Sequence, residues 1–145
     1  MTVSVLISVY NTEKAHLLEK ALRSVWEDQT LKPAQIVLIE DGPLGEELLN
    51  VIKSYKDKLG DKLCVCKNKT NMGLTKSLNA GLLHVTSDLV ARMDSDDISD
   101  PKRFERQVEF LEAHPDIDIV GGALQEFDEK HDCLNVRHYP LTPDE

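Results

Sequence analysis

Hydrophobic residues follow two spacings along this chain, short continuous runs and longer segments with an apolar residue every three or four positions. The runs predict buried strands at residues 3–9, 35–39, 63–67, 89–93 and 117–122. The longer spacing predicts amphipathic helices between the strands. Their expected apolar faces comprise Leu17, Leu18, Ala21, Leu22 and Val25; Leu48, Ile52, Tyr55 and Leu59; Leu74, Leu78, Leu82 and Val85; and Phe104, Val108 and Leu111.

Residues typical of helix ends support this division. Asn11 and Thr12 are expected to cap the first helix, with Glu13 in its first turn. Gly60 suits the C-cap of the second helix, and residues 99–101 open the fourth. The alternation of strand and helix predicts an α/β fold, with a mostly parallel sheet and helices on both faces.

Polar residues follow three of the predicted strands at the point where each strand ends. They are Tyr10-Asn11, Glu40-Asp41-Gly42 and the run from Asp94 to Asp97. Parallel strands end at one edge of a sheet, and open α/β sheets bind ligands there. The sequence therefore predicts that these three clusters converge on one site.

The run Met93-Asp94-Ser95-Asp96-Asp97 points to a metal–nucleotide site. Its three carboxylates repel one another, so a positive charge is expected beside them. Mg²⁺ prefers one or two carboxylates together with phosphate oxygens. No glycine-rich phosphate loop follows the first strand, which leaves the phosphate charge to a metal. The alternative is a solvated loop in which Ser95 or Asp97 caps a helix.

Composition narrows the class of protein. The chain has 145 residues, 41% hydrophobic and 30% charged, as expected for one globular domain. Its net charge of −9 argues against a non-specific nucleic-acid binder. No apolar run is long enough to span a membrane, and no leader segment is evident, so a cytoplasmic location is expected.

The cysteines fit a reducing compartment, since Cys64, Cys66 and Cys133 form an odd set without framework spacing. Cys64 and Cys66 share one face of a strand. Two thiols without further partners make a poor metal site, and the five histidines share no ligand spacing, so core packing is expected for these cysteines.

Six segments in this order resemble the inverting family-2 glycosyltransferases, whose fold is GT-A, a Rossmann-like fold of nucleotide-diphospho-sugar transferases. The resemblance covers almost all of residues 3–128. The Asp-x-Asp pattern alone is weak, but the full set in one order is specific. The segments are residues 8–13, 39–42, 71–81, 93–99, 101–107 and 118–122.

The resemblance implies roles at the nucleoside end of the site. Tyr10 and the backbone of Val9 should flank the nucleobase, and Glu13 should lie near the ribose. Asp41 should accept a hydrogen bond from the N3–H of uracil, which suits a carboxylate because it only accepts. Asp41 before Gly42 is alternatively only a turn residue.

Further roles follow at the diphosphate. Asn71, Gly73 and Lys76 resemble the loop and cation beside the nucleoside and diphosphate. The departures are Ser8, where the family often has proline, Glu40, where it often has aspartate, and Pro43, where it often has serine. None is expected to touch the core chemistry, although Glu40 could tune the base pocket.

The acid cluster also receives roles from the resemblance. Asp94 should serve the ribose or sugar, and Asp96 should bind a divalent metal, Mg²⁺ or Mn²⁺, with Asp97 as a second candidate ligand. The metal would stabilise the diphosphate leaving group.

An inverting transfer also needs a general base, which the family takes from the second half of the domain. We therefore expect residues 1–145 to be a GT-A nucleotide-sugar-binding domain truncated on its C-terminal side, without its base. The alternative assigns the base to Asp128, Glu129 or Asp132, in a polar segment expected to form a solvated hairpin. Apolar surface near residues 117–141 should then remain uncovered and favour a homodimer.

The predicted function is transfer of a sugar from a UDP-sugar donor to a saccharide or lipid-linked acceptor, with inversion, in surface-polysaccharide synthesis. The acceptor implies peripheral association of the full-length enzyme with the inner face of the membrane. Two alternatives stay open. A nucleotidyltransferase would want a glycine-rich basic loop, which residues 10–13 are not. A non-catalytic nucleotide-binding domain could use the same fold.

Overall fold

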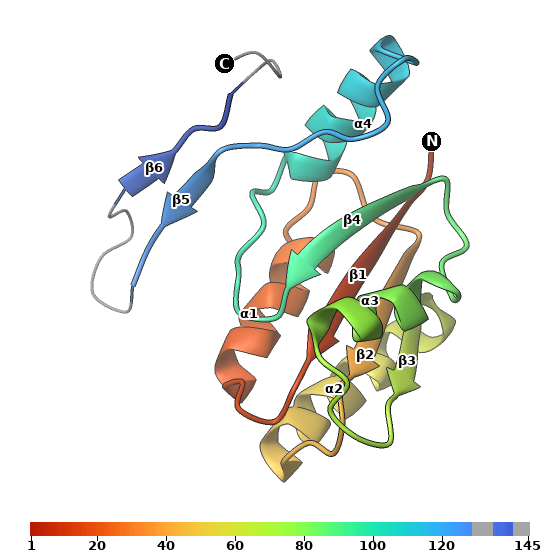
Figure 1. Ribbon diagram of the computed structural model, residues 1–145, viewed down its shortest axis with the longest axis vertical. Coiled ribbons are helices and arrows are strands. Elements are labelled where there is room, and N and C mark those ends of the chain that lie inside the picture. Colours follow the sequence, from red (N-terminus) through yellow and green to blue (C-terminus); the bar gives the residue numbers. More distant parts are fainter. Residues whose placement is uncertain (129–134, 141–145) are drawn as a thin grey trace. The chain divides into compact units, whose positions relative to one another are not determined.

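The computed structural model describes residues 1–128 and 135–140. The chain divides into two compact units, Met1–Val108 and Glu109–Glu145. The first unit is built on a four-stranded sheet (Figure 1), whose strands are β1 (Val3–Val9), β2 (Gln35–Glu40), β3 (Leu63–Lys67) and β4 (Leu89–Asp94).

All neighbouring strands of this sheet are parallel, in the order β3-β2-β1-β4. In the pairing register, Ser8 lies opposite Ile39 of β2 and Asp94 of β4. The carboxyl ends of β2, β1 and β4 therefore lie side by side. The predicted convergence of the polar clusters is confirmed.

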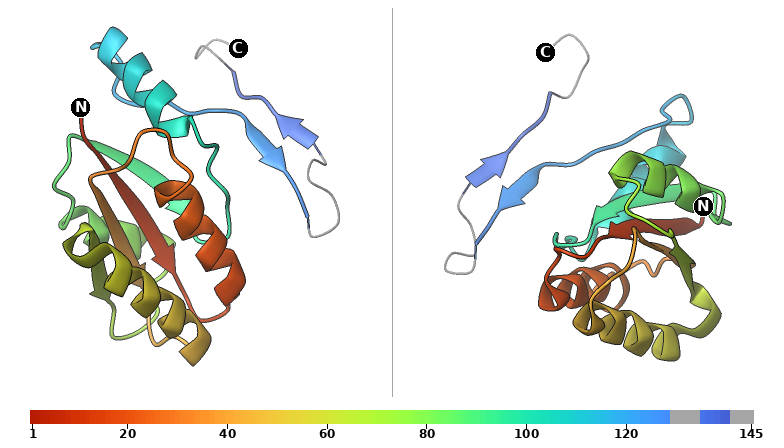
Figure 2. Two further views of the ribbon diagram at one scale, coloured as in Figure 1. Left: turned by 180° about the vertical axis from the view of Figure 1, so that it is seen from behind. Right: turned by 60° about the horizontal axis from the view of Figure 1, so that its bottom comes forward.

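Helices cover both faces of the sheet, as predicted. The helices α1 (Ala15–Trp26) and α2 (Glu46–Leu59) lie on one face, and α3 (Leu74–Leu82) lies on the other (Figure 2, right). A short 3-10 helix, Gly60–Lys62, follows α2, and α4 spans Arg103–Ala113. Within the described part of the chain, no helix combines the length and apolar character needed to cross a bilayer.

The central strands β1 and β2 are buried on both faces, which is typical of parallel sheets. Side chains of β1 alternate between the faces, so Val5 and Ile7 join the larger core beside α1 and α2. Leu6 points the other way, into a smaller cluster with Val37 and Ile39. The predicted strands of this unit are thus confirmed within a residue at their ends.

The helix α3 differs from its prediction. Its buried residues are Ser77 and Gly81, whereas Leu74 and Leu82 are exposed. A Cβ atom at Gly81 would lie 2.5 Å from Ile39 Cδ1. The helix packs on the sheet through its small residues because its backbone approaches the sheet so closely.

The start of α1 also differs from its prediction. The helix begins at Ala15, after Lys14, and no side chain caps it. Glu13 therefore lies outside the first turn, and its backbone N–H donates to Tyr10 O at 3.1 Å. Residues 10–13 form a turn after β1 and remain available at the sheet edge.

The second unit contains no strand at residues 117–122, so that prediction is wrong. Ile119 is 87% exposed, and the adjacent Gly121 and Gly122 offer no side chain for packing. The expected hairpin is present in β5 (Leu124–Glu126) and β6 (Asn135–Arg137), which pair antiparallel.

Candidate functional site

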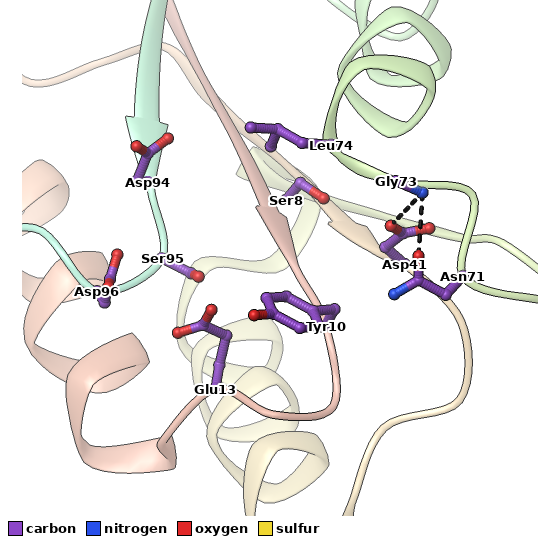
Figure 3. A pocket seen from close by; sticks show the side chains of 10 residues that line it. All are labelled: Ser8, Tyr10, Glu13, Asp41, Asn71, Gly73, Leu74, Asp94, Ser95 and Asp96. Carbon is purple, nitrogen blue, oxygen red and sulfur yellow. Dashed lines mark hydrogen bonds between the residues drawn. The ribbon is translucent and has the colours of Figure 1, made fainter.

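A pocket of about 400 Å³ opens at the carboxyl edge of the sheet (Figure 3). Its walls come from the segments after β1, β2 and β4 and from the start of α3, so it joins residues that are distant in sequence. The lining residues are Ser8, Tyr10, Glu13, Asp41, Asn71, Gly73, Leu74, Asp94, Ser95 and Asp96.

Three residues assigned to the site from the sequence do not line this pocket. The Val9 side chain is fully buried, and its carbonyl oxygen accepts the backbone N–H of Asp41 at 2.8 Å. Lys76 is exposed on α3, and Asp97 is exposed beyond the lining residue Asp96.

Ser8, Leu74 and Ser95 line the pocket although no such role was expected for them. Ser8 lies two positions before Tyr10, so strand alternation could have placed both on one face. Leu74 was expected in a buried helix face, yet it is 48% exposed at the helix start. The departure at Ser8 therefore lies in the pocket lining.

One wall of the pocket is organised by Asp41, which is only 4% exposed. Its Oδ1 accepts the backbone N–H of Met72 at 2.7 Å and the side-chain amide of Asn68 at 3.0 Å. Its Oδ2 accepts the backbone N–H of Gly73 at 3.0 Å. Burial acts to raise the pKa of Asp41, but these hydrogen bonds, with one from Ser77, outweigh it and lower the pKa below the usual value.

Two glycines let this wall form. Gly42 has φ of +89°, and a Cβ atom there would lie 2.7 Å from the backbone nitrogen of Asn71. Gly73 has φ of +84° and precedes α3, and its N–H also donates to Asn71 Oδ1 at 3.0 Å (Figure 3). Residues 71–73 therefore sit directly on the turn after β2 and are held there by Asp41. We call these three residues together with Asp41 the amide wall.

The neighbouring Glu40 lies beside this wall but does not line the pocket. It is 5% exposed, and its Oε2 is 3.2 Å from Lys67 Nζ. The side chain pairs with the adjacent strand β3, opposite which it lies in the register.

The opposite wall consists of Glu13, Asp94 and Asp96, which we call the acid wall (Figure 3). Burial raises the pKa of Glu13, and the negative charges of Asp96 and Asp94 raise it further. Burial and the same two charges also raise the pKa of Asp97, while Arg103 and Arg92 oppose the rise. Both shifts show that negative charge accumulates on this side.

The chain neutralises part of that charge itself. Arg92 Nη2 donates to Asp94 Oδ1 at 2.9 Å, and Arg103 contributes a favourable charge to Asp97. Part of the positive charge expected beside the acids thus comes from the chain's own arginines. Glu13 and Asp96 have no such arginine contact among the described residues.

The donor set of the acid wall fits a hard divalent cation. Mg²⁺ and Mn²⁺ prefer oxygen ligands, and Mg²⁺ in particular binds through one or two carboxylates with phosphates and waters completing its shell. Within the described residues, no three carboxylates gather their oxygens within 4.8 Å of one another.

One group of side chains was missed by the sequence analysis. The structure brings His84 to Cys64 and Cys66, with their ligand atoms within 4.8 Å of one another. No spacing rule could find this group because α3 and its following turn separate His84 from β3 in sequence.

The sequence model of a protein family, described as glycosyl transferase family 2, matches residues 4–143. The chain belongs to this family. The family-2 chain is 45% identical over 139 residues to the amylovoran biosynthesis glycosyltransferase AmsE of Erwinia amylovora, covering 96% of the chain and 51% of AmsE.

A second relative is the UDP-Gal:alpha-D-GlcNAc-diphosphoundecaprenol beta-1,3-galactosyltransferase of Escherichia coli. It is 36% identical over 125 residues, which cover 86% of this family-2 chain and 44% of that enzyme. The chain thus spans about half the length of these relatives.

Among solved structures, S. aureus TarS in complex with UDP-GlcNAc is similar, with a TM-score of 0.68 and 26% identity. The match covers 79% of this family-2 chain and 32% of the TarS chain. The α/β architecture is that of GT-A glycosyltransferases, as the motifs implied.

Proposed function

We propose that this family-2 chain is the donor-binding part of a glycosyltransferase that transfers a sugar from a UDP-sugar to a saccharide or lipid-linked acceptor, with inversion. The observation that carries the proposal is the pocket with an amide wall facing an acid wall at the sheet edge. The names of two similar proteins support the donor, since one contains UDP-Gal and the other is a complex with UDP-GlcNAc.

In this proposal the amide wall binds the nucleoside. Asp41 Oδ2 accepts from Gly73, and a carboxylate oxygen can accept a second hydrogen bond, which we assign to the N3–H of uracil. Tyr10, 43% exposed at the pocket, flanks the base, with the Val9 backbone beside it. Asn71 and Gly73 shape the base pocket.

The acid wall takes the ribose and diphosphate. Glu13 lies nearest the ribose and Asp94 near the ribose or sugar. Asp96, which lines the pocket, is the proposed ligand for Mg²⁺ or Mn²⁺, and Asp97 is a second candidate. When bound, the metal would supply charge stabilisation to the diphosphate leaving group. Lys76 adds positive charge near the diphosphate from the exposed face of α3.

We assign no general base within the pocket, because its carboxylates are all assigned to binding the donor. Of the three alternative bases, Asp128 is exposed, and Glu129 and Asp132 lie outside the described residues. We propose that residues 1–145 form the nucleotide-sugar-binding portion of a GT-A domain. The base and most acceptor contacts then come from the part that the longer relatives have in addition.

The acceptor side of the proposal rests on the relatives' names. One contains a diphosphoundecaprenol acceptor and another names biosynthesis of the polysaccharide amylovoran. We accordingly propose a role in surface-polysaccharide synthesis, in the cytoplasm at the inner face of the membrane. Association of two copies through apolar residues such as Ile119 and Tyr139 is part of this proposal.

Titration calorimetry with UDP, ADP and GDP, each with and without Mn²⁺, tests the function. We expect Mn²⁺-dependent UDP binding that is at least about tenfold tighter than ADP or GDP binding. A preference for nucleoside triphosphates with release of pyrophosphate would indicate a nucleotidyltransferase instead. Absence of nucleotide binding would indicate a non-catalytic domain and contradict the proposal.

A further inference from the structure

The group Cys64, Cys66 and His84 lies away from the pocket, where β3 meets the turn after α3. Cys64 and Cys66 alternate with Val65 on β3, so both thiols point to the same face. Their sulfur atoms are 3.9 Å apart. His84 follows α3, and all three ligand atoms lie within 4.8 Å of one another.

This spacing matches the geometry of a tetrahedral zinc site. A Zn–S bond is about 2.3 Å long, so two thiolates on one tetrahedral zinc ion have sulfur atoms roughly 3.8 Å apart. The observed separation of 3.9 Å between the Cys64 and Cys66 sulfurs requires almost no adjustment. The ligand set of two cysteines and one histidine is one that zinc takes in proteins with a fourth position left open.

The surroundings hold Cys64 and Cys66 in place, whereas the His84 ring is free to adjust. Both cysteines are partly buried against the small core cluster, in which Leu78 and Val85 also pack. The backbone of His84 is held at both ends, since its N–H donates to Gly81 O at 3.0 Å and its carbonyl accepts Gln35 Nε2 at 3.0 Å. Its ring is exposed and can turn toward the sulfurs.

Without a metal, the surroundings favour the protonated form of Cys66. Burial, followed by the proximity of Cys64, raises the pKa of Cys66 to about 11. A bound cation reverses that preference, because a coordinating thiol is deprotonated outright.

We propose that Cys64, Cys66 and His84 form a binding site for a thiophilic divalent cation, Zn²⁺, with water in the fourth position. As each S–Zn bond forms, the thiol proton passes to the solvent, and neither oxidant nor reductant takes part. The imidazole binds in its neutral form. The site is distinct from the acid wall, because thiolates select zinc over the hard cations that carboxylates prefer.

The bound ion would tie the edge strand β3 to the C-terminal end of α3. The loop that contains Asn68 and Asn71 joins β3 to the start of α3. The ion would therefore link β3 to the opposite end of that helix. Ligands that bind only the folded state stabilise it by mass action. We expect Zn²⁺ at 100 times its Kd to raise Tm by roughly 5 °C.

The test is titration of the reduced chain with Co²⁺, followed by competition with Zn²⁺ against a chromophoric chelator. Co²⁺ should give thiolate-to-cobalt charge-transfer absorption and tetrahedral ligand-field bands at one ion per chain. Cys64→Ser and Cys66→Ser should each weaken Zn²⁺ binding at least about 100-fold, since even outer-shell substitutions cost 10–100-fold. His84→Ala should weaken it and shift the ligand-field bands while retaining thiolate absorption.

Matched controls separate this site from unspecific binding. His114→Ala removes an imidazole elsewhere and should leave Zn²⁺ affinity unchanged. Asp96→Asn should also leave it unchanged, which distinguishes this site from the acid wall. Octahedral cobalt without thiolate absorption, or equal Zn²⁺ affinity in the parent and the Cys66→Ser variant, would overturn the proposal.

Discussion

The two walls of the pocket contrast in how their charges are satisfied. In the amide wall, Asp41 is buried, accepts hydrogen bonds from Asn68, Met72 and Gly73, and has a lowered pKa. In the acid wall, Glu13 has a raised pKa because burial and two neighbouring carboxylates disfavour its charge. One wall is complete without a ligand, and the other carries negative charge that the chain only partly balances.

The difference separates two tasks that a donor site must perform. Recognition of a flat base needs acceptors and donors in fixed positions, so a wall held by internal hydrogen bonds is suited to it. Stabilising a diphosphate requires added positive charge, and a wall that stores unbalanced negative charge attracts a cation. The variants below act on one wall at a time.

The largest effect is expected from Asp96→Asn in the acid wall. Loss of the proposed metal ligand should weaken Mn²⁺-dependent UDP binding about 100-fold or more, since even outer-shell changes cost 10–100-fold. The fold should persist, and Tm of the metal-free chain should stay constant or rise because one repelling charge is gone. Calorimetry with Mn²⁺ present measures the first effect. Unchanged UDP affinity would remove Asp96 from the metal site.

A smaller effect is expected from Asp41→Ala in the amide wall. A hydrogen bond to a charged group contributes about 1.5–3 kcal/mol, so the preference for UDP over ADP should fall tenfold or more. Because Asp41 also holds residues 71–73, Tm should fall as well. Asn71→Ala is the matched control, since it loosens the same loop but keeps the carboxylate. Equal loss of base preference in both variants would assign recognition to the loop rather than to Asp41.

The walls should respond to pH with opposite signs. The lowered pKa of Asp41 gives stability that is present above its unfolded pKa and is lost as pH falls through its folded pKa. The raised pKa of Glu13 gives stability that is present below its unfolded pKa and is lost as pH rises through its folded pKa.

Glu13→Gln should therefore raise Tm of the metal-free chain by a few degrees at pH 7 and flatten its decline above the ordinary carboxylate pKa. Thermal melts between roughly pH 3 and pH 8, a range that includes the carboxylate titrations, measure both slopes. Glu19→Gln on the exposed face of α1 is the control and should change neither slope. A steeper decline in the Glu13→Gln variant would contradict the electrostatic account of the acid wall.

The smallest effect is expected from Lys76→Ala, because Lys76 is exposed and lies outside the pocket lining. Exposed charge pairs contribute little, so UDP affinity should fall only about two- to fivefold, and the difference should disappear in high salt. Binding isotherms at two salt concentrations give the comparison. A loss as large as that of Asp96→Asn would mean that Lys76 contacts the diphosphate directly.

Sequence reasoning succeeded where one physical rule dominates. Continuous apolar runs place β1, β2, β3 and β4, and the parallel arrangement then brings Tyr10, Asp41 and Asp94 to one edge. It failed at 117–122, where the apolar run resembles a strand but the segment adopts irregular structure and Ile119 is exposed. Periodicity alone cannot supply the pairing partner that a strand requires.

Other failures concern contacts that depend on tertiary distance. The backbone N–H groups of Met72 and Gly73 donate to Asp41 because their loop lies close to Gly42. The approach of His84 to Cys64 and Cys66 depends on where α3 ends above the sheet. Neither has a signature in local spacing, because each depends on how close segments that are separate in sequence come in the fold.

The absence of a side-chain carbon at Gly81 sets how closely α3 can approach the sheet beside the pocket. A methyl group at this position would overlap Leu6 Cδ1 at 2.6 Å as well as Ile39 Cδ1, so either these buried side chains or α3 would have to shift. The helix is rigid, and its first turn carries the pocket residue Leu74 at roughly 10 Å along the axis from Gly81. A family member could therefore keep every motif residue of the pocket and still misplace them through one added carbon in the core.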